Sequence, residues 1–199
     1  MLNIYIVRHG ESKDNAKSIL SSYLDKGLTA LGRKQSKELA QTLKQMGVNF
    51  TAVYVSPLKR AKETAQVIVR ELKLKAAKVM PSLVERNLGL MHGKPTVDII
   101  PLYYPDIVVT EGVTYILKGY GVETFPQLLQ RAKTVLANIK KKHRSGNILL
   151  VAHGDIGKMI FAAYYHLDWL TAIKLFYFKN SDALLLSKGL NPKQAYISK

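Results

Sequence analysis

The stretch NIYIVRHGES, residues 3–12, changes character halfway along its length. Its first half is mostly apolar, as in a strand that is buried in a sheet. Arg8 and His9 follow directly where this strand should end, and Gly10 comes after them. Because an exposed loop also tolerates such a polar pair, this stretch alone leaves the role of Arg8 and His9 open.

A second apolar strand ends in the same way. The stretch ILLVAHG, residues 148–154, places His153 and Gly154 directly after a fully apolar run. In a parallel sheet the histidines of both strands would lie at the carboxyl edge, where open α/β folds bind ligands. The adjacent glycines would let a ligand approach the backbone closely, and a helix that begins near Gly154 would favour an anion.

A third strand leads into SPLKRAKETA, residues 56–65, which places Arg60 in the first turn of a helix. A positive charge there opposes the helix dipole, so an anion should lie nearby. Two imidazoles and two guanidinium groups at one edge fit a phosphoryl group, because the planar fork of arginine matches phosphate oxygens and a neutral imidazole can attack phosphorus. The sequence therefore predicts a phosphoryl-transfer site at this edge.

The rest of the chain alternates between strand-like and helix-like patterns, which predicts an α/β fold with a largely parallel sheet. One helix is predicted with Ser56 as its N-cap and Pro57 as its first residue. Other helices are predicted over 29–47, from Pro126 to about Ile139, and over 154–167. Strands are predicted at 2–7, 51–56, 77–80, 147–152, 174–178 and 183–187.

Residues 86–123 interrupt this alternation. Glycine, proline and tyrosine recur through the segment, and no periodicity is sustained. We interpret the segment as an insertion at the site and call it the lid. The whole chain, residues 1–199, is predicted to form a single domain, because it contains no repeats and no low-complexity linker.

Composition narrows the class of protein. The chain has no cysteine, which excludes disulfides and thiolate catalysis and fits a cytoplasmic location. No apolar run approaches the roughly 20 residues that span a bilayer, so we expect no membrane association. A formal net charge of +16 favours anionic partners. We expect no specific nucleic-acid binding, because no recognisable motif is present and aromatic residues are not interleaved with the lysines.

Several blocks of the sequence resemble the histidine phosphatase superfamily, also called phosphoglycerate mutase-like, branch 1. RHGESKDN (8–15) is similar to the family signature, SPLKRAKETA to its second block, and VAHGD (151–155) to the block that holds its second histidine. LTALGRKQ (28–35) and GVETFPQLLQRA (121–132) resemble its flanking helices. The resemblance covers nearly the whole chain and implies a three-layer αβα sandwich with a mostly parallel mixed sheet.

The resemblance also implies roles for individual residues. His9 would be the nucleophile that becomes phosphohistidine, and His153 would be catalytic by stabilising the transferring phosphoryl group. Ser12 stands where the family most often has threonine, and its hydroxyl is a candidate substrate contact. Phosphate would be bound by Arg8, Asn15, Arg60, His153 and Gly154.

In the family a carboxylate shortly after the third strand gives a proton to the leaving oxygen, and SLVERNLG (82–89) places Glu85 there. Arg86 follows this acid, as an arginine often does in the mutases, and is a candidate substrate contact. The family usually continues with a Glu-Gly pair, whereas this chain has His92 before Gly93, so His92 is a further candidate. The remaining histidines are predicted to lie on helical surfaces without a role: His143 and His166.

Three functions are open at this point. The short segment between Glu85 and His153 resembles the broad-specificity phosphatases, which favours hydrolysis of a small phosphorylated metabolite without a metal or cofactor. A phosphoglycerate mutase is the first alternative, because mutases keep the phosphohistidine and return the phosphoryl group to another hydroxyl. A non-catalytic basic protein that binds phosphorylated ligands or nucleic acid is the second. The sequence leaves both a monomer and a homodimer open.

Overall fold

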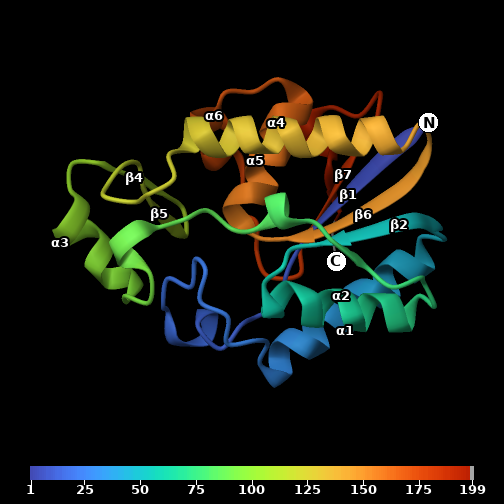
Figure 1. Cartoon of the computed structure of the whole chain (residues 1–199), viewed down its shortest axis with the longest axis horizontal. Helices are drawn as coiled ribbons and strands as arrows, with labels where there is room; N and C mark the ends of the chain where they lie inside the picture. Colours follow the sequence, from blue (N-terminus) through green and yellow to red (C-terminus); the bar gives the residue numbers. More distant parts are fainter. Residues whose placement is uncertain (198–199) are drawn as a thin grey trace.

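A six-stranded sheet forms the middle layer of the computed structural model, which describes residues 1–197 (Figure 1). Its strands are β1 (Leu2–Arg8), β2 (Phe50–Val55), β3 (Lys78–Val79), β6 (Gly146–Ala152), β7 (Ala183–Leu186) and β8 (Tyr196–Ile197). They lie in the order β3-β2-β6-β1-β7-β8. The first four are parallel neighbours, whereas β7 and β8 are added antiparallel at one edge.

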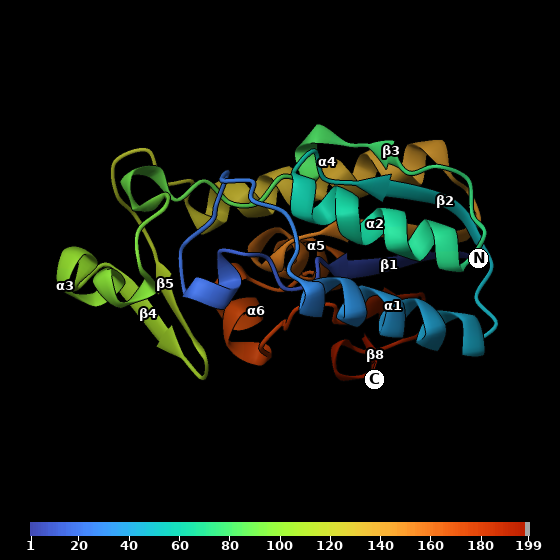
Figure 2. The same cartoon turned by 90° about the horizontal axis from the view of Figure 1, so that it is seen from below.

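Helices cover both faces of this sheet (Figures 1 and 2). Because side chains alternate along a strand, β1 sends Ile4 and Ile6 into one core and Tyr5 and Val7 into the other. The first core packs against α4 (Phe125–Lys142), α5 (Gly154–Tyr165) and α6 (Trp169–Leu175), and the second against α1 (Ala30–Gln45) and α2 (Lys59–Glu71). The predicted three-layer αβα fold with a mostly parallel mixed sheet is confirmed.

The lid has regular structure that its sequence did not predict. It contains α3 (Ile99–Tyr103) and an antiparallel hairpin of β4 (Ile107–Thr110) and β5 (Val113–Ile116), which extend to one side of the sandwich in both views (Figures 1 and 2). A small core of its own includes Leu88, Met91 and Ile99. Short 3₁₀ helices complete the fold: η1 (Asn15–Lys17), η2 (Pro81–Leu83), η3 (Gly89–Met91), η4 (Thr96–Asp98) and η5 (Pro192–Gln194).

Two local predictions were wrong. The strand predicted at 174–178 is instead the end of α6 and an irregular, unpaired segment, because Asp168 caps that helix by accepting from the Thr171 amide. The helix predicted to begin at Pro57 begins at Lys59, and Ser56 does not cap it. The other predicted strands and helices agree with the structure to within a few residues. The short strand β8 was not predicted.

Within residues 1–197, no helix is both long enough and apolar enough to cross a membrane.

Candidate active site

A cavity of about 710 Å³ opens at the carboxyl edge of the parallel strands. Its walls come from the loop after β1, the start of α2, residues 85–88, the lid and the start of α5. The predicted residues that line it are Arg8, His9, Asn15, Arg60, Glu85 and Arg86. The topology therefore brings side chains from distant parts of the sequence to one edge of the sheet.

The orientation of the His9 ring is fixed by its neighbours. Its Nδ1 lies 2.7 Å from the Gly10 carbonyl, which can only accept, so this nitrogen carries the proton. The other nitrogen, Nε2, lies 3.1 Å from Arg60 Nε and accepts from it. Burial, then the charges of Arg60 and Arg8, hold the pKa of His9 well below its usual value. His9 is thus a neutral imidazole with its Nε2 lone pair toward the arginine.

His153 lies beside His9, with ring centroids 5.1 Å apart. Its Nε2 shares a 2.7 Å hydrogen bond with the Ser56 hydroxyl, whose oxygen also accepts from the Leu58 amide at 3.3 Å. Burial, then the charge of Arg60, holds the pKa of His153 well below its usual value. Within residues 1–197 the buried Nδ1 of His153 has no hydrogen-bond partner, although His153 lies behind His9 and does not itself line the cavity.

Two arginines place positive charge at the histidines. Arg60 is nearly fully buried, and its NH1 and NH2 groups donate to the Leu24 and Ser22 carbonyls. Arg8 donates through NH1 to the Phe178 carbonyl, whereas its buried Nε has no partner among the described residues. An anion at this position would satisfy Arg8 Nε.

Each helix N-terminus at the site receives a carboxylate, as expected for the positive end of a helix dipole. Asp25 accepts from the Lys59 and Arg60 amides of α2, so it is the anion that the position of Arg60 predicted. Glu85 accepts from the Asp155 and Ile156 amides of α5, at 3.3 and 3.2 Å.

Burial and the nearby charge of Asp155 raise the pKa of Glu85, against the lowering effect of the backbone amides and Arg60. A raised pKa suits a carboxyl group that must hold a proton. Gly154 lies between this carboxyl and Arg8, since a Cβ atom there would stand 3.7 Å from both Glu85 Oε2 and Arg8 Nε. Glu85 and Arg8 therefore approach the same small space.

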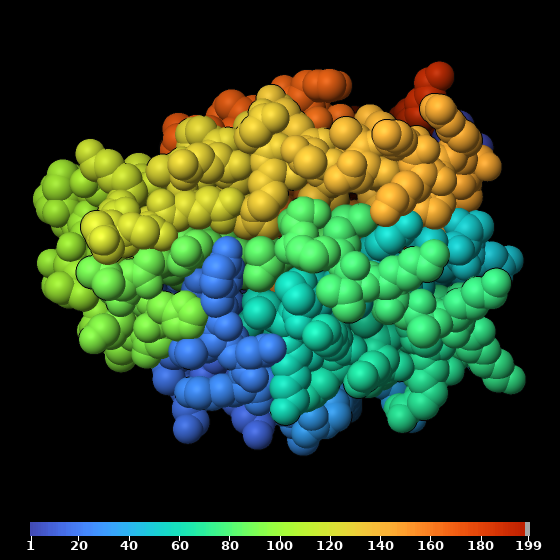
Figure 3. Space-filling view, in the orientation of Figure 1, coloured from blue at the N-terminus to red at the C-terminus, as the bar shows by residue number. Residues whose placement is uncertain are grey.

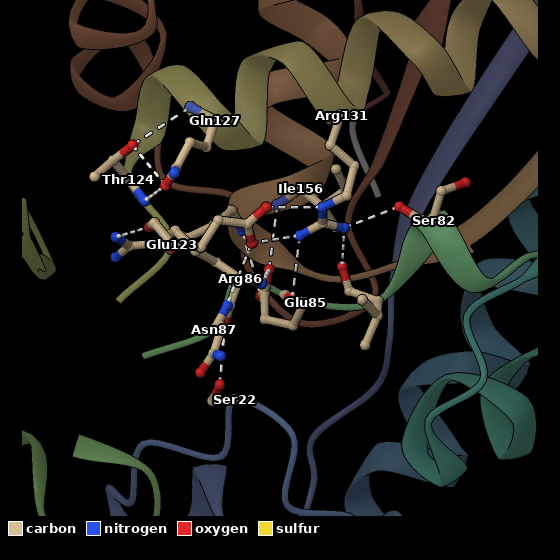
Figure 4. Close-up of polar contacts among 12 residues, drawn as sticks. Ser22, Ser82, Glu85, Arg86, Asn87, Glu123, Thr124, Gln127, Arg131 and Ile156 are labelled. Carbon is tan, nitrogen blue, oxygen red and sulfur yellow. Dashed lines mark hydrogen bonds and ion pairs between the residues drawn. The ribbon is translucent and has the colours of Figure 1, made fainter. Parts of the chain in front are cut away.

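The segment that carries Glu85 is held from above by α4 (Figure 4). Arg131 donates to the Ser82, Val84 and Glu85 carbonyls and also pairs with Glu123, at 2.7 Å between NH2 and Oε2. This guanidinium group thereby fixes the backbone on both sides of the carboxyl group.

Arg86 is 2% exposed, and its Nε donates to Asp155 Oδ2 at 2.7 Å. Its NH1 donates to the Ile116 carbonyl, and its guanidinium lies 4.2 Å from the centre of the Phe125 ring. These contacts join the lid to α4 and α5. Although Arg86 lines the cavity, most of its hydrogen-bonding capacity serves the fold.

Of the remaining candidates, Asn15 lines the cavity, whereas Ser12 and His92 do not. Asn15 lines the cavity, and its side-chain oxygen accepts from the Ser12 amide. Ser12 is buried and accepts from the Asn15 amide, so it holds the loop and does not line the cavity. His92 also lies away from the cavity wall, edge-on to Tyr23 with ring centroids 6.4 Å apart.

The other two histidines lie at helix ends. His143 bonds the Tyr54 hydroxyl at the end of α4, and His166 follows α5. Neither lines the cavity.

Sequence reasoning missed four residues that build the site: Asp25, Ser56 in its actual role, Arg131 and Asn180. Asn180 lines the cavity and donates to the His9 carbonyl. Of these four, only Ser56 could have been recognised from the sequence, because it directly follows a strand, as His9 and His153 do. Across residues 1–197 no three His, Asp or Glu side chains are grouped so that they could hold a metal ion.

Comparisons with known proteins bear on this arrangement. The model of the histidine phosphatase superfamily (branch 1) matches residues 4–182. The chain is 26% identical to a 2,3-bisphosphoglycerate-dependent phosphoglycerate mutase of Bartonella henselae, over 94% of this chain and 97% of the mutase. It is 32% identical to a metal-independent phosphoserine phosphatase of Arabidopsis thaliana, over 79% of this chain and 66% of that protein. The solved structure of Bacillus stearothermophilus YhfR has the same fold, with a TM-score of 0.82 at 22% identity over 99% of this chain and 95% of that one.

Proposed function

Because the chain belongs to the histidine phosphatase superfamily (branch 1), we propose that it hydrolyses phosphomonoesters through a phosphohistidine on His9. One observation carries the proposal: a neutral imidazole and a carboxyl group of raised pKa face one cavity, beside two arginines. This combination supplies a nucleophile, a proton donor and positive charge for the phosphoryl oxygens.

The reaction proceeds in two steps. His9 Nε2 attacks phosphorus, the bond from phosphorus to the ester oxygen breaks, and Glu85 gives its proton to that oxygen, which leaves as the alcohol. Water then attacks the phosphohistidine, Glu85 takes a proton from it, and inorganic phosphate leaves. Arg8, Arg60 and His153 stabilise the charge on the phosphoryl oxygens in both steps.

Labelling of His9 tests this proposal. With an ester that carries ³²P, the wild-type chain should form an acid-labile, base-stable phosphoenzyme in rapid-quench experiments. His9→Ala should form none and should release phosphate at least 10³-fold more slowly, because the nucleophile is gone. Activity within tenfold of wild type in this variant would contradict the role of His9.

A phosphoglycerate mutase is the second candidate, since the similarity to the Bartonella mutase spans nearly both chains. The contacts of Arg86 weaken the sequence argument for it, because that guanidinium is bound to Asp155 and to backbone. Incubation of 3-phosphoglycerate with 2,3-bisphosphoglycerate separates the two activities. Formation of 2-phosphoglycerate faster than release of inorganic phosphate would favour the mutase.

A further inference from the structure

The distribution of charge in the cavity limits what the alcohol part of a substrate can carry. Within the described residues its only cationic side chains are Arg8, Arg60 and Arg86. The first two lie at the histidines, and Arg86 is bound to Asp155 and the Ile116 carbonyl. A carboxylate on the substrate would therefore find no free cation beyond the phosphoryl end. The Glu11 carboxylate on the wall would repel it, whereas the charge of Asp155 is paired with Arg86.

The wall that the lid contributes to the cavity is mostly apolar, although Thr96, Thr110 and Thr114 also belong to it. Lid residues Val97, Ile100 and Val113 line it, together with Tyr177 from the segment after α6. Val97 is 77% exposed and Ile100 is 51% exposed, although apolar side chains of this size gain from leaving water. A ligand that extends from the histidines toward the lid would cover them.

The walls of the cavity are joined to one another. The loop after β1 pairs with the lid through an isolated bridge between Ile19 and Pro95, and the Gly93 amide donates to the Leu20 carbonyl. Figure 3 shows this loop, in blue, between the green lid and the teal helix α2. The cavity of about 710 Å³ lies in the range of sites for drug-sized ligands, so a phosphorylated three-carbon acid would leave much of it unfilled.

We infer that this chain, given the proposed hydrolase activity, selects phosphomonoesters of uncharged, apolar alcohols and discriminates against phosphorylated carboxylic acids. The phosphoryl group lies at Arg8, His9 and Arg60. The alkyl or aryl group lies against the lid, where Val97 and Ile100 pack on it.

A series of straight-chain alkyl phosphates tests the inference. From ethyl to butyl, hexyl and octyl phosphate, used as monomers in solution, kcat/KM should rise by about fourfold for each added methylene until the apolar part of the lid wall is covered. 3-Phosphoglycerate and phosphoserine should react more slowly than butyl phosphate. A flat series, or a preference for the two acids, would overturn the inference while leaving the hydrolase proposal intact.

Two variants of α3 localise the effect. Ile100→Asn should lower the octyl-to-ethyl ratio of kcat/KM at least tenfold. Leu102→Asn is the matched control, because Leu102 lies on the same short helix and is 62% exposed but does not line the cavity, and it should keep the wild-type ratio. Equal ratios in the two variants would show that Ile100 of the lid does not contribute to the proposed subsite. Thermal melts verify that both variants fold.

Binding of alkyl phosphonates separates this inference from the hydrolase proposal. These compounds have no ester bond to break, so calorimetry reports affinity alone. A Kd that falls with chain length, without turnover of any ester, would contradict the hydrolase proposal and support the apolar subsite. A Kd that is independent of chain length would contradict the subsite whether or not esters are hydrolysed.

Discussion

At the scale of single residues, two groups with opposite requirements share the cavity. In the proposed mechanism His9 must be neutral to attack phosphorus, and Glu85 must be protonated to act as an acid. Burial serves both, because it disfavours the charged form of each group and so lowers the pKa of His9 and raises that of Glu85. The two required forms therefore coexist over a range of acidic pH that free side chains would not share.

The pH profile of kcat/KM for an alkyl phosphate follows from these directions. Activity should persist below pH 6.5, since His9 stays neutral there, and should fall as the pH rises through the raised pKa of Glu85. Glu85→Gln should lose this alkaline limb and be slower by a factor of about 10² to 10⁴.

Glu11→Gln is the control for that profile, because Glu11 also lines the cavity but bonds the Thr29 hydroxyl. This variant experiences the same ionisation of the substrate, and we expect it to keep the wild-type limbs. An alkaline limb that is unchanged in Glu85→Gln would show that another group supplies the proton.

At the scale of elements, the position of Glu85 depends on contacts between α4, the segment before the lid and α5. Arg131 of α4 fixes the backbone of this segment, and the α5 amides bind the carboxylate itself. Glu85 is therefore positioned by two helices that lie far from it in the sequence.

Arg131→Met tests this arrangement. Loss of the hydrogen bonds to Ser82, Val84 and Glu85 should lower the free energy of unfolding by on the order of 2–3 kcal/mol. A displaced Glu85 should slow phosphohistidine formation more with alkyl esters, whose alkoxides need a proton, than with an activated aryl ester. Denaturant titration measures the change in the free energy of unfolding, and rapid quench measures the rate of phosphohistidine formation.

The matched control for Arg131 is Arg144→Met, which removes an exposed arginine beyond the end of the same helix. It should alter neither stability nor the ratio of alkyl to aryl rates. If Arg131→Met slows both esters equally, its role is confined to stability.

At the scale of the whole molecule, a buried lysine joins three parts of the fold. Lys158 of α5 is 2% exposed and donates to the Tyr115 hydroxyl in the lid, at 2.9 Å, and to the Ile173 carbonyl in α6, at 3.0 Å. Burial lowers its pKa to about 8, with Asp155 acting in the opposite direction. The lid hairpin is thus connected to the sandwich by a cation that is costly to bury.

The pH dependence of stability reports this cost. A lysine whose pKa is lower in the folded protein binds its proton more weakly there, so stability rises as the pH increases from about 8 toward its unfolded value of 10.5. Relative to Lys158→Met, the wild type should gain up to about 3 kcal/mol over this window. Urea titrations at several pH values measure the difference. Lys133→Met removes an exposed lysine of α4 but keeps Lys158, so it should show the same gain as the wild type relative to Lys158→Met. Absence of the gain in Lys133→Met would contradict the assignment to Lys158.

The sequence by itself determined the layers of the fold and the strand ends that carry His9 and His153, because both follow from local periodicity and from glycines placed after apolar strands. It also predicted that an anion should offset Arg60, though not that Asp25 supplies it. The phosphatase-like blocks implied the roles of Arg8, Arg60 and Glu85.

Only the tertiary structure decided how the lid folds and how Glu85 is held. The hairpin of β4 and β5 lacks strong local periodicity, and it is stabilised by pairing within the lid and by packing around Met91 and Ile99. The Ser56 hydroxyl bonds His153, which lies far away in the sequence, and Arg131 donates to a carbonyl group nearly fifty positions away. Such contacts join residues distant in sequence, so their partners are set when the layers pack together and no local pattern encodes them.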